Sequence, residues 1–331
     1  MHVEKLKERL NNAQNILILT HQSIDHDAIF GVLMLHHILS RYFSDKNTEI
    51  ITNEKEWPKF KDWNLYGYEH INNVKRHSEI EFEKYNLIFL VDVSQYDRSL
   101  KNFTPAQEIL DKTVVIDHHS IENPANFGLI INSSKSSSSE QIFVLFRELL
   151  GEKFEIDDRV AYFTQMGIVA DTNRFLFNAQ ISPETYKILA ETSAVKKLNL
   201  ENEYYRMLNN TVNSIYVFNE LINQAKFVDD YCYTVLPRKL RKKFVFRDTK
   251  GAVGMFLNIF IRTLQGVNWG FVVKPTSKRN IWRVSFRSRT DTKDVSKIAE
   301  KLGGGGHINA AAGTVRAKNE KKAVEEILKV L

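Results

Sequence analysis

The sequence predicts an α/β protein, with a mostly parallel sheet in an N-terminal domain and a smaller α/β domain at the C-terminus. Short apolar runs alternate with helical patterns along the first half of the chain, which is typical of a parallel sheet. Strand-like runs, helical patterns and a glycine run follow in the last third. With 331 residues, 43% of them apolar, the chain is long enough for roughly two domains.

Four apolar runs are predicted as strands of the first sheet, and each ends at a polar or ionisable residue. They are Ile16–Leu19, Leu87–Val91, Val114–Ile116 and Leu129–Ile131. A helix is predicted over 142–150, and Ser137 with Glu140 fits a capping box at its start, so we favour capping over phosphate binding for this serine run. Ligands of open parallel sheets bind beyond the carboxyl ends of the strands, so the residues that follow the runs are expected to converge.

A helical stretch from Pro183 to about Asn223 is predicted to contain the connector between the domains. The expected division is residues 1–190, a connector over 191–222, and residues 223–331. In the second domain we predict strands and helices at Tyr231–Leu236, Trp269–Lys274, Ile281–Arg287, Lys293–Leu302 and from Asn319 onward.

The composition limits which metal sites the chain can form and where in the cell the protein is expected. The chain has 46 Lys and Arg against 40 Asp and Glu, a formal charge of +6, and a single cysteine, Cys232. One cysteine excludes an intramolecular disulfide framework and a cysteine-based zinc site, so a metal would need His and carboxylate ligands. The N-terminus lacks the apolar core of a signal peptide, and no stretch approaches the roughly 20 apolar residues that span a bilayer, so we expect a cytoplasmic protein without a membrane partner.

His and Asp residues near the ends of the apolar runs form a mixed set of candidate metal ligands. The set is His21, Asp25, Asp27, Asp92, Asp117, His118, His119 and Asp171. Asp25 and Asp27, both expected in a loop, would point to opposite sides of an extended turn and so suit two neighbouring cations. A single strand-end Asp usually serves a turn. The combination favours Mn²⁺, with Mg²⁺ less suited to imidazole ligands.

Five motifs in order along the chain resemble the DHH phosphoesterases. Four carry the His and Asp residues above, and the fifth, Gly303 to His307, is similar to the glycine motif of the C-terminal domain that accompanies one of the subfamilies. In size and layout the chain is most similar to the branch that degrades very short RNA and dephosphorylates 3′-phosphoadenosine 5′-phosphate. The chain departs from the family pattern at Phe30 and Asn173, where glycine is common, and neither departure removes a ligand.

The resemblance implies a site with two divalent metal ions, Mn²⁺ before Mg²⁺. It assigns His21, Asp25 and Asp92 to one ion. To the second ion it assigns Asp27, Asp92, His118 and Asp171. Asp92 would bridge the two ions, His119 would face the scissile phosphate, and Asp117 would support the site through contacts behind the ligands.

Candidate substrate contacts lie mainly in the second domain. Arg283, Ser285, Arg287 and Arg289 share a face of a predicted strand. Four glycines exceed what a helix stop needs, and their backbone could approach a nucleotide closely. By resemblance, the residues that hold the nucleotide or its distal phosphate are Arg287, Gly305, Gly306 and His307. Arg98 is a weaker candidate for a phosphate contact. An ordinary surface position without a role in binding is an equally good interpretation of this residue.

A basic segment precedes these candidates. Residues 237–250 hold seven basic side chains and one acidic one. This charge would either steer polyanionic substrates or only keep the protein soluble, and the sequence leaves both readings open.

The resemblance implies hydrolysis of short RNA oligonucleotides and linear dinucleotides, and of the 3′-phosphate of nucleoside bisphosphates. Cyclic di-adenylate hydrolysis is the nearest alternative. A RecJ-like exonuclease usually needs further nucleic-acid-binding domains, and an inorganic pyrophosphatase lacks the glycine motif. An inactive RNA-binding module is disfavoured by the intact ligand set. The oligomeric state is left open between a monomer and a homodimer.

Overall fold

The computed structural model describes residues 2–22, 24–53, 71–74, 77–119, 121, 125–176, 180–203, 210–289 and 292–331. The chain forms two compact units, Met1–Glu203 (unit 1) and Tyr204–Leu331 (unit 2), and each is described by itself. The division falls inside the connector expected over residues 191–222. Among the described residues, none of the helices has both the length and the apolar character needed to span a bilayer.

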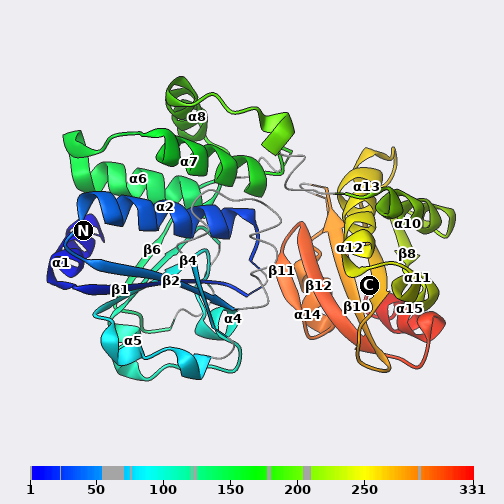
Figure 1. Cartoon of the computed structure of the whole chain (residues 1–331). Helices are drawn as coiled ribbons and strands as arrows, with labels where there is room; N and C mark the ends of the chain where they lie inside the picture. The colour runs from blue at the N-terminus through cyan, green and yellow to red at the C-terminus, as the bar shows by residue number, and fades with distance from the viewer. Residues whose placement is uncertain are drawn as a thin grey trace. The chain divides into compact units, whose positions relative to one another are not determined.

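Unit 1 is built on a parallel sheet in which the described strands follow the order β3-β2-β1-β4-β5-β6 (Figure 1). The strands are β1 (Asn15–Thr20), β2 (Asn47–Asn53), β3 (Ile71–Val74), β4 (Leu87–Val91), β5 (Thr113–Asp117) and β6 (Leu129–Asn132). The chain winds outward in one direction from β1 and in the other from β4. This reversal places a ligand crevice at the carboxyl ends of β1 and β4.

Helices cover both faces of this sheet. They are α1 (His2–Asn12), α2 (His26–Tyr42), α4 (Tyr96–Ser99), α5 (Gln107–Asp111), α6 (Ser138–Leu150), α7 (Asp158–Asp171) and α8 (Pro183–Val195), with short 3-10 turns at His77–Glu79, Phe82–Lys84 and Gly151–Lys153. Figure 1 shows α2, α6 and α7 on one side and α4 and α5 on the other. Because α2 packs against the sheet as well as against α6 and α7, its residues 27–35 are all buried.

Unit 2 contains a mixed sheet in the order β11-β12-β10-β9-β8-β7, where β8 and β9 are parallel and the other pairs are antiparallel. Its strands are β7 (Lys226–Val228), β8 (Tyr231–Val235), β9 (Trp269–Pro275), β10 (Ile281–Ser288), β11 (Gly305–His307) and β12 (Ala310–Arg316). Its helices are α10 (Val212–Asn223), α11 (Arg238–Lys243), α12 (Phe246–Met255), a π-helical segment η6 (Phe256–Phe260), α13 (Ile261–Thr263), α14 (Ser296–Lys301) and α15 (Glu320–Leu328).

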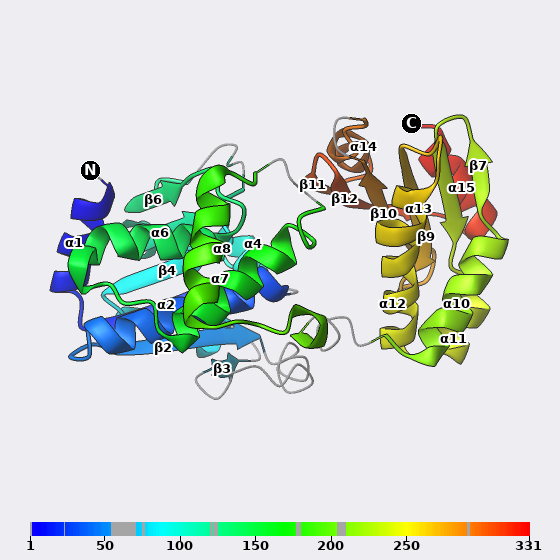
Figure 2. The ribbon, with the colours of Figure 1, turned by 90° about the horizontal axis from the view of Figure 1, so that it is seen from above.

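Each face of the second sheet has its own apolar core. Phe271, Trp282 and Phe286 pack with α14 and α15 on one face. Cys232 and Val272 pack on the other face with α10, α12 and η6, and α10 lies beside α12 (Figure 2). The predicted α/β class, with a parallel N-terminal sheet and a smaller second domain, is confirmed.

Candidate metal centre

The predicted ligands of unit 1 come together at the carboxyl ends of its strands. His21 follows β1, Asp92 follows β4, and His118 follows β5. Asp171 is the last residue of α7. Of the two carboxylates expected in the first loop, Asp25 lies at its end as the N-cap of α2, accepting from Ala28 N at 3.1 Å. Asp27 lies inside the first turn of that helix. The expectation of a loop was therefore wrong for Asp27.

The first group of ligand atoms surrounds the imidazole of His21. His21 Nε2 lies 3.6 Å from Asp25 Oδ2 and 3.4 Å from Asp92 Oδ2. One atom from each of the three side chains falls within 4.8 Å of the others. This is a compact set of one nitrogen and two carboxylates.

The second group surrounds His118. His118 Nε2 lies 3.4 Å from Asp171 Oδ2 and 3.6 Å from Asp92 Oδ1, and Asp27 joins His118 and Asp171 within 4.8 Å. Asp92 thus turns one oxygen toward each histidine. An overlapping group links Asp92 and His118 with His119.

The donor chemistry of His118 fits a divalent cation. Its Nδ1 lies 3.2 Å from both the Lys135 carbonyl and Gln180 Oε1, which places the ring proton there. Its Nε2 is buried without a hydrogen-bond partner among the described residues, and its separations from the carboxylates exceed hydrogen-bond length. An imidazole held by outer contacts, with its other nitrogen facing carboxylates, is the usual arrangement of a metal ligand.

The protonation equilibria show excess negative charge in this region. Burial and the carboxylates of Asp92 and Asp171 raise the pKa of Asp27 well above its usual range, and burial raises the pKa of Asp171 to about 6. Burial lowers the pKa of His118, but the surrounding Asp side chains outweigh it and raise it to about 9. The carboxylates therefore need positive charge between them, from protons or from a metal ion.

His119 and Asp117 form a pair at the edge of the second group. His119 Nδ1 lies 2.6 Å from Asp117 Oδ1, which also accepts from the His119 backbone N–H at 3.1 Å. Asp117 is fully buried, and although burial opposes it, the hydrogen bond from His119 lowers the pKa of Asp117. Asn132 at the end of β6 donates to the carbonyls of Asp117 and His119, so the backbone of the loop is held as well.

Sequence reasoning missed two serines that hold the ligand carboxylates. Ser138 N donates to Asp27 Oδ2 at 2.6 Å, and Ser139 donates to Asp27 Oδ1 through its N–H (3.1 Å) and its hydroxyl (2.6 Å). The Ser138 hydroxyl donates to Asp92 Oδ1 at 2.9 Å. The predicted N-cap at Ser137 is confirmed, but the reciprocal contact differs, because Glu140 accepts from Ser136. The signal was four consecutive serines at a helix start beside a ligand-bearing sheet edge.

The two departures from the family pattern are compatible with the site. Phe30 is buried and packs against Tyr162 and Phe163, which joins α2 to α7. Asn173 has a φ of +46°, a left-handed conformation that Asn tolerates better than most residues. Between them, Gly167 leaves room for the serines: a Cβ there would lie 2.1 Å from Ser139 Oγ and 2.7 Å from Asp27 Oδ1.

Arg98 lies beside this region on α4. Its carbonyl accepts from Gln22 N at 2.7 Å, and Ser99 Oγ donates to Thr20 O at 2.7 Å, so α4 adjoins the loop after β1. The Arg98 side chain is exposed. Its assignment to substrate stays a prediction.

The candidate substrate residues of unit 2 lie on neighbouring strands. Arg287 of β10 is opposite Ala310 of β12, which is opposite His307 of β11. Arg287 Nε donates to Asn258 Oδ1 at 3.1 Å from the π-helical segment. The glycine run, expected as a ligand cradle, forms part of an edge strand.

Three glycines of the run have structural reasons to be glycine. Gly303 has a φ of +63° after α14, and a Cβ at Gly304 or Gly306 would lie 2.0 or 2.5 Å from a β12 carbonyl. A Cβ at Gly305 would meet nothing within 4 Å. The fold therefore has room for a side chain at Gly305 and does not itself require glycine there.

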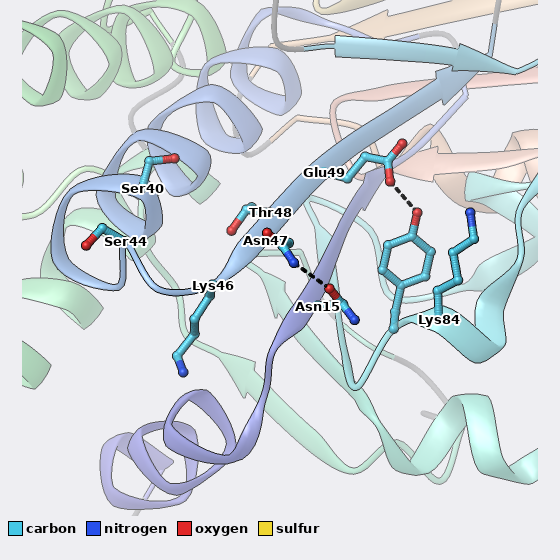
Figure 3. A pocket seen from close by; sticks show the side chains of 9 residues that line it. Asn15, Ser40, Ser44, Lys46, Asn47, Thr48, Glu49 and Lys84 are labelled. Atoms are coloured by element: carbon cyan, nitrogen blue, oxygen red, sulfur yellow. Dashed lines mark hydrogen bonds between the residues drawn. The ribbon is translucent and has the colours of Figure 1, made fainter.

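A separate pocket of about 710 Å³ opens at the amino ends of β1 and β2, and two pairs of its polar side chains are hydrogen-bonded to each other (Figure 3). Asn47 Nδ2 donates to Asn15 Oδ1 at 2.9 Å, and Tyr85 donates to Glu49 at 2.5 Å. None of the predicted ligands lines it.

Comparisons with known proteins find two domains in the chain. The model of the DHH family, N-terminal domain, matches residues 15–168, and the DHHA1 domain matches residues 234–331. The chain is 24% identical to the bifunctional oligoribonuclease and PAP phosphatase NrnA of Bacillus subtilis, over 96% of this chain and 94% of that protein.

Solved structures share the fold. An exopolyphosphatase-related protein from Bacteroides fragilis superposes with a TM-score of 0.80 at 22% identity, covering 99% of this chain and 94% of the other. RecJ from Thermus thermophilus, solved in complex with Mn²⁺, has a TM-score of 0.58 at 16% identity, covering 99% of this chain and 53% of RecJ. The chain therefore carries the N-terminal domain of the DHH family, followed by a DHHA1 domain.

Proposed function

We propose that the protein is a metal-dependent phosphoesterase that hydrolyses very short RNA and linear dinucleotides to mononucleotides. It would also convert 3′-phosphoadenosine 5′-phosphate to AMP. The observation that carries the proposal is the pair of His and Asp groups that share Asp92. The bifunctional name of the Bacillus subtilis relative supports the choice of substrates.

The ligand groups suit two divalent ions, with Mn²⁺ favoured by the mixture of imidazole and carboxylate donors. His21, Asp25 and Asp92 would hold one ion. The other would be held by Asp27, Asp92, His118 and Asp171. Two bound ions of this kind lower the pKa of a water molecule and stabilise negative charge on phosphoryl oxygens. The Mn²⁺ complex of RecJ supports the choice of metal.

The residues around the ligands have positioning tasks. Asp117 fixes the orientation of the His119 ring, so that His119 can act on the scissile phosphate as a hydrogen-bond donor. Ser138 and Ser139 hold Asp27 and Asp92 in place. In unit 2, Arg287, Gly305, Gly306 and His307 would contact the nucleotide or its distal phosphate.

The test is hydrolysis by the purified full chain supplied with Mn²⁺. The substrates are a labelled RNA dinucleotide and 3′-phosphoadenosine 5′-phosphate, and the products are mononucleotides and inorganic phosphate. We expect release from both and none in excess EDTA. Absence of release from both substrates with Mn²⁺ or Mg²⁺ would contradict the proposal, and faster turnover of cyclic than of linear di-adenylate would favour the alternative.

A further inference from the structure

Basic side chains gather on one face of the sheet in unit 2. Arg283 and Arg287 lie four residues apart on β10, and Lys274 of β9 is directly opposite Arg283. We call Lys274, Arg283 and Arg287 the cation face. At about 3.3 Å per residue, Arg283 and Arg287 are separated by roughly 13 Å along the strand. They are therefore placed to contact two different groups of a ligand.

The cation face continues to the glycine strand. Ser285, between the two arginines, is opposite Ala312 of β12, and Ala312 is opposite Gly305 of β11. Residues directly opposite in antiparallel strands project to the same side of the sheet. Arg283, Arg287 and Gly305 therefore lie on one surface, which extends the candidate nucleotide site beyond Arg287.

The charge at Lys274 is not balanced within the described part of the chain. Neither Lys274 nor Arg283 has a carboxylate within ion-pair distance or a side-chain hydrogen bond among the described residues. Instead, burial and the neighbouring cations Arg283, Arg287 and Lys250 lower the pKa of Lys274 to about 8. A half-buried ammonium among like charges is unfavourable unless an anion joins it.

Several other basic residues of unit 2 have partners. In the basic segment, Arg238 stacks on Trp282 at 4.7 Å and Arg241 on Phe246 at 5.7 Å from the ring centroids. Lys322 and Lys329 pair with glutamates at 2.6 Å. Lys274 differs from these residues, because it is half-buried and its ammonium has no such partner among the described residues.

We propose that Lys274 and Arg283 form a second phosphate subsite in unit 2, separate from Arg287, which binds a second phosphate of the same nucleotide ligand. The ligand class is nucleotides with two or more phosphates, namely nucleoside bisphosphates and short oligonucleotides. A phosphate offers three acceptor oxygens and up to two negative charges, which match an ammonium beside a guanidinium. This inference rests on the proposed function, because that function assigns a nucleotide to the same face.

The first experiment measures binding of the full chain in EDTA, so that no hydrolysis occurs. Calorimetry compares adenosine 3′,5′-bisphosphate with AMP for wild type, Lys274→Gln and Arg283→Gln. Each variant should bind the bisphosphate about tenfold more weakly, as expected for one lost charge-assisted contact, and AMP nearly as well as wild type. Lys318→Gln, an exposed change of equal charge in the same unit, should bind both as wild type does.

The second experiment measures the salt dependence of binding to a labelled four-nucleotide RNA. For a single strand, each lost phosphate contact reduces the slope of log K against log salt by about 0.7. We expect this reduction in Lys274→Gln and in Arg283→Gln, and an unchanged slope in Lys318→Gln. The exposed Arg283 also keeps the test valid if Lys274→Gln fails to fold.

Three results would contradict the proposed subsite. They are no preference of wild type for the bisphosphate over AMP, equal weakening of both ligands in the variants, or the same loss in Lys318→Gln. The outcomes separate this inference from the proposed function. If the variants weaken bisphosphate binding but the protein shows no Mn²⁺-dependent hydrolysis, the subsite is supported and the proposed function is contradicted. If the protein hydrolyses its substrates but the variants bind the bisphosphate as wild type does, the proposed function is supported and the subsite is contradicted.

Discussion

The two units carry opposite charge at their candidate sites. In unit 1, burial and neighbouring carboxylates raise the pKa of Asp27 and of Asp171. In unit 2, burial and neighbouring cations lower the pKa of Lys274. Like charges oppose one another within each candidate site, so a cation would stabilise the first and an anion the second. The metal ions and the phosphate-bearing ligand proposed above would supply these counter-charges.

The largest expected effect follows from Asp92→Asn in unit 1. Because Asp92 turns one oxygen to each ligand group, we expect hydrolysis to fall by at least about 1,000-fold, more than the 10–100-fold typical of a lost supporting contact. Asn tolerates the φ of +60° at this position, so circular dichroism should show an intact fold. Retained turnover, or two equivalents of bound Mn²⁺ at unchanged affinity, would contradict the shared role.

A second, smaller effect is expected from Gly167→Ala. The new methyl group would displace Ser139 or Asp27, so Mn²⁺ affinity measured by calorimetry should fall about 10–100-fold. Gly254→Ala is the matched control, because that helical glycine has open space around it and Ala should raise the free energy of unfolding by up to about 1 kcal/mol. Equal metal affinity in both variants would show that the serines do not position Asp27.

A pair of variants in the glycine run separates fold from binding. Gly304→Ala places a methyl group 2.0 Å from the Ala312 carbonyl, so we expect the free energy of unfolding to fall by about 1–3 kcal/mol. Gly305→Ala meets open space and should unfold like wild type, but should bind adenosine 3′,5′-bisphosphate more weakly. Unfolding in urea and calorimetry measure the two effects, and wild-type affinity in Gly305→Ala would remove Gly305 from the nucleotide site.

The smallest expected effect is the pH dependence of nucleotide binding. Lys274, faced by Lys250, Arg283 and Arg287, has its pKa lowered to about 8, so its charge is present below that pH and is lost as the pH rises toward 9. Phosphate is already ionised, with a second pKa of about 6, so affinity for the bisphosphate should fall between pH 7 and 9. Lys274→Arg stays charged and should bind without this decline. Identical pH profiles for the two proteins would contradict the assignment.

The parallel sheet and the convergence of the candidate ligands could be predicted from the sequence because both depend on local signals. Each apolar run ends where a polar residue begins, and parallel strands bring those ends to one edge. The position of Asp27 within α2 was missed because a short Asp-rich turn and a helix start have similar composition. The run of serines before α6 was a local signal, but the bonds of Ser138 and Ser139 to Asp27 span more than a hundred residues, so the run alone did not reveal this role.

Unit 2 was less predictable for a related reason. Strands β7 and β11 are three residues long, and β12 is rich in small residues, so none has the alternating apolar pattern of a strand. The position of Lys274 opposite Arg283 depends on the register between β9 and β10. Register is set by packing across the sheet, and the sequence does not state it.

The contact of Asp27 with the first turn of α6 has a consequence for how the protein can be observed. One carboxylate accepts the amide protons of Ser138 and Ser139 and also belongs to the ligand set. The start of a helix is thereby tied to the candidate metal centre. Deuterium uptake at these two amides should report whether the centre is loaded, even in a variant that has lost all turnover.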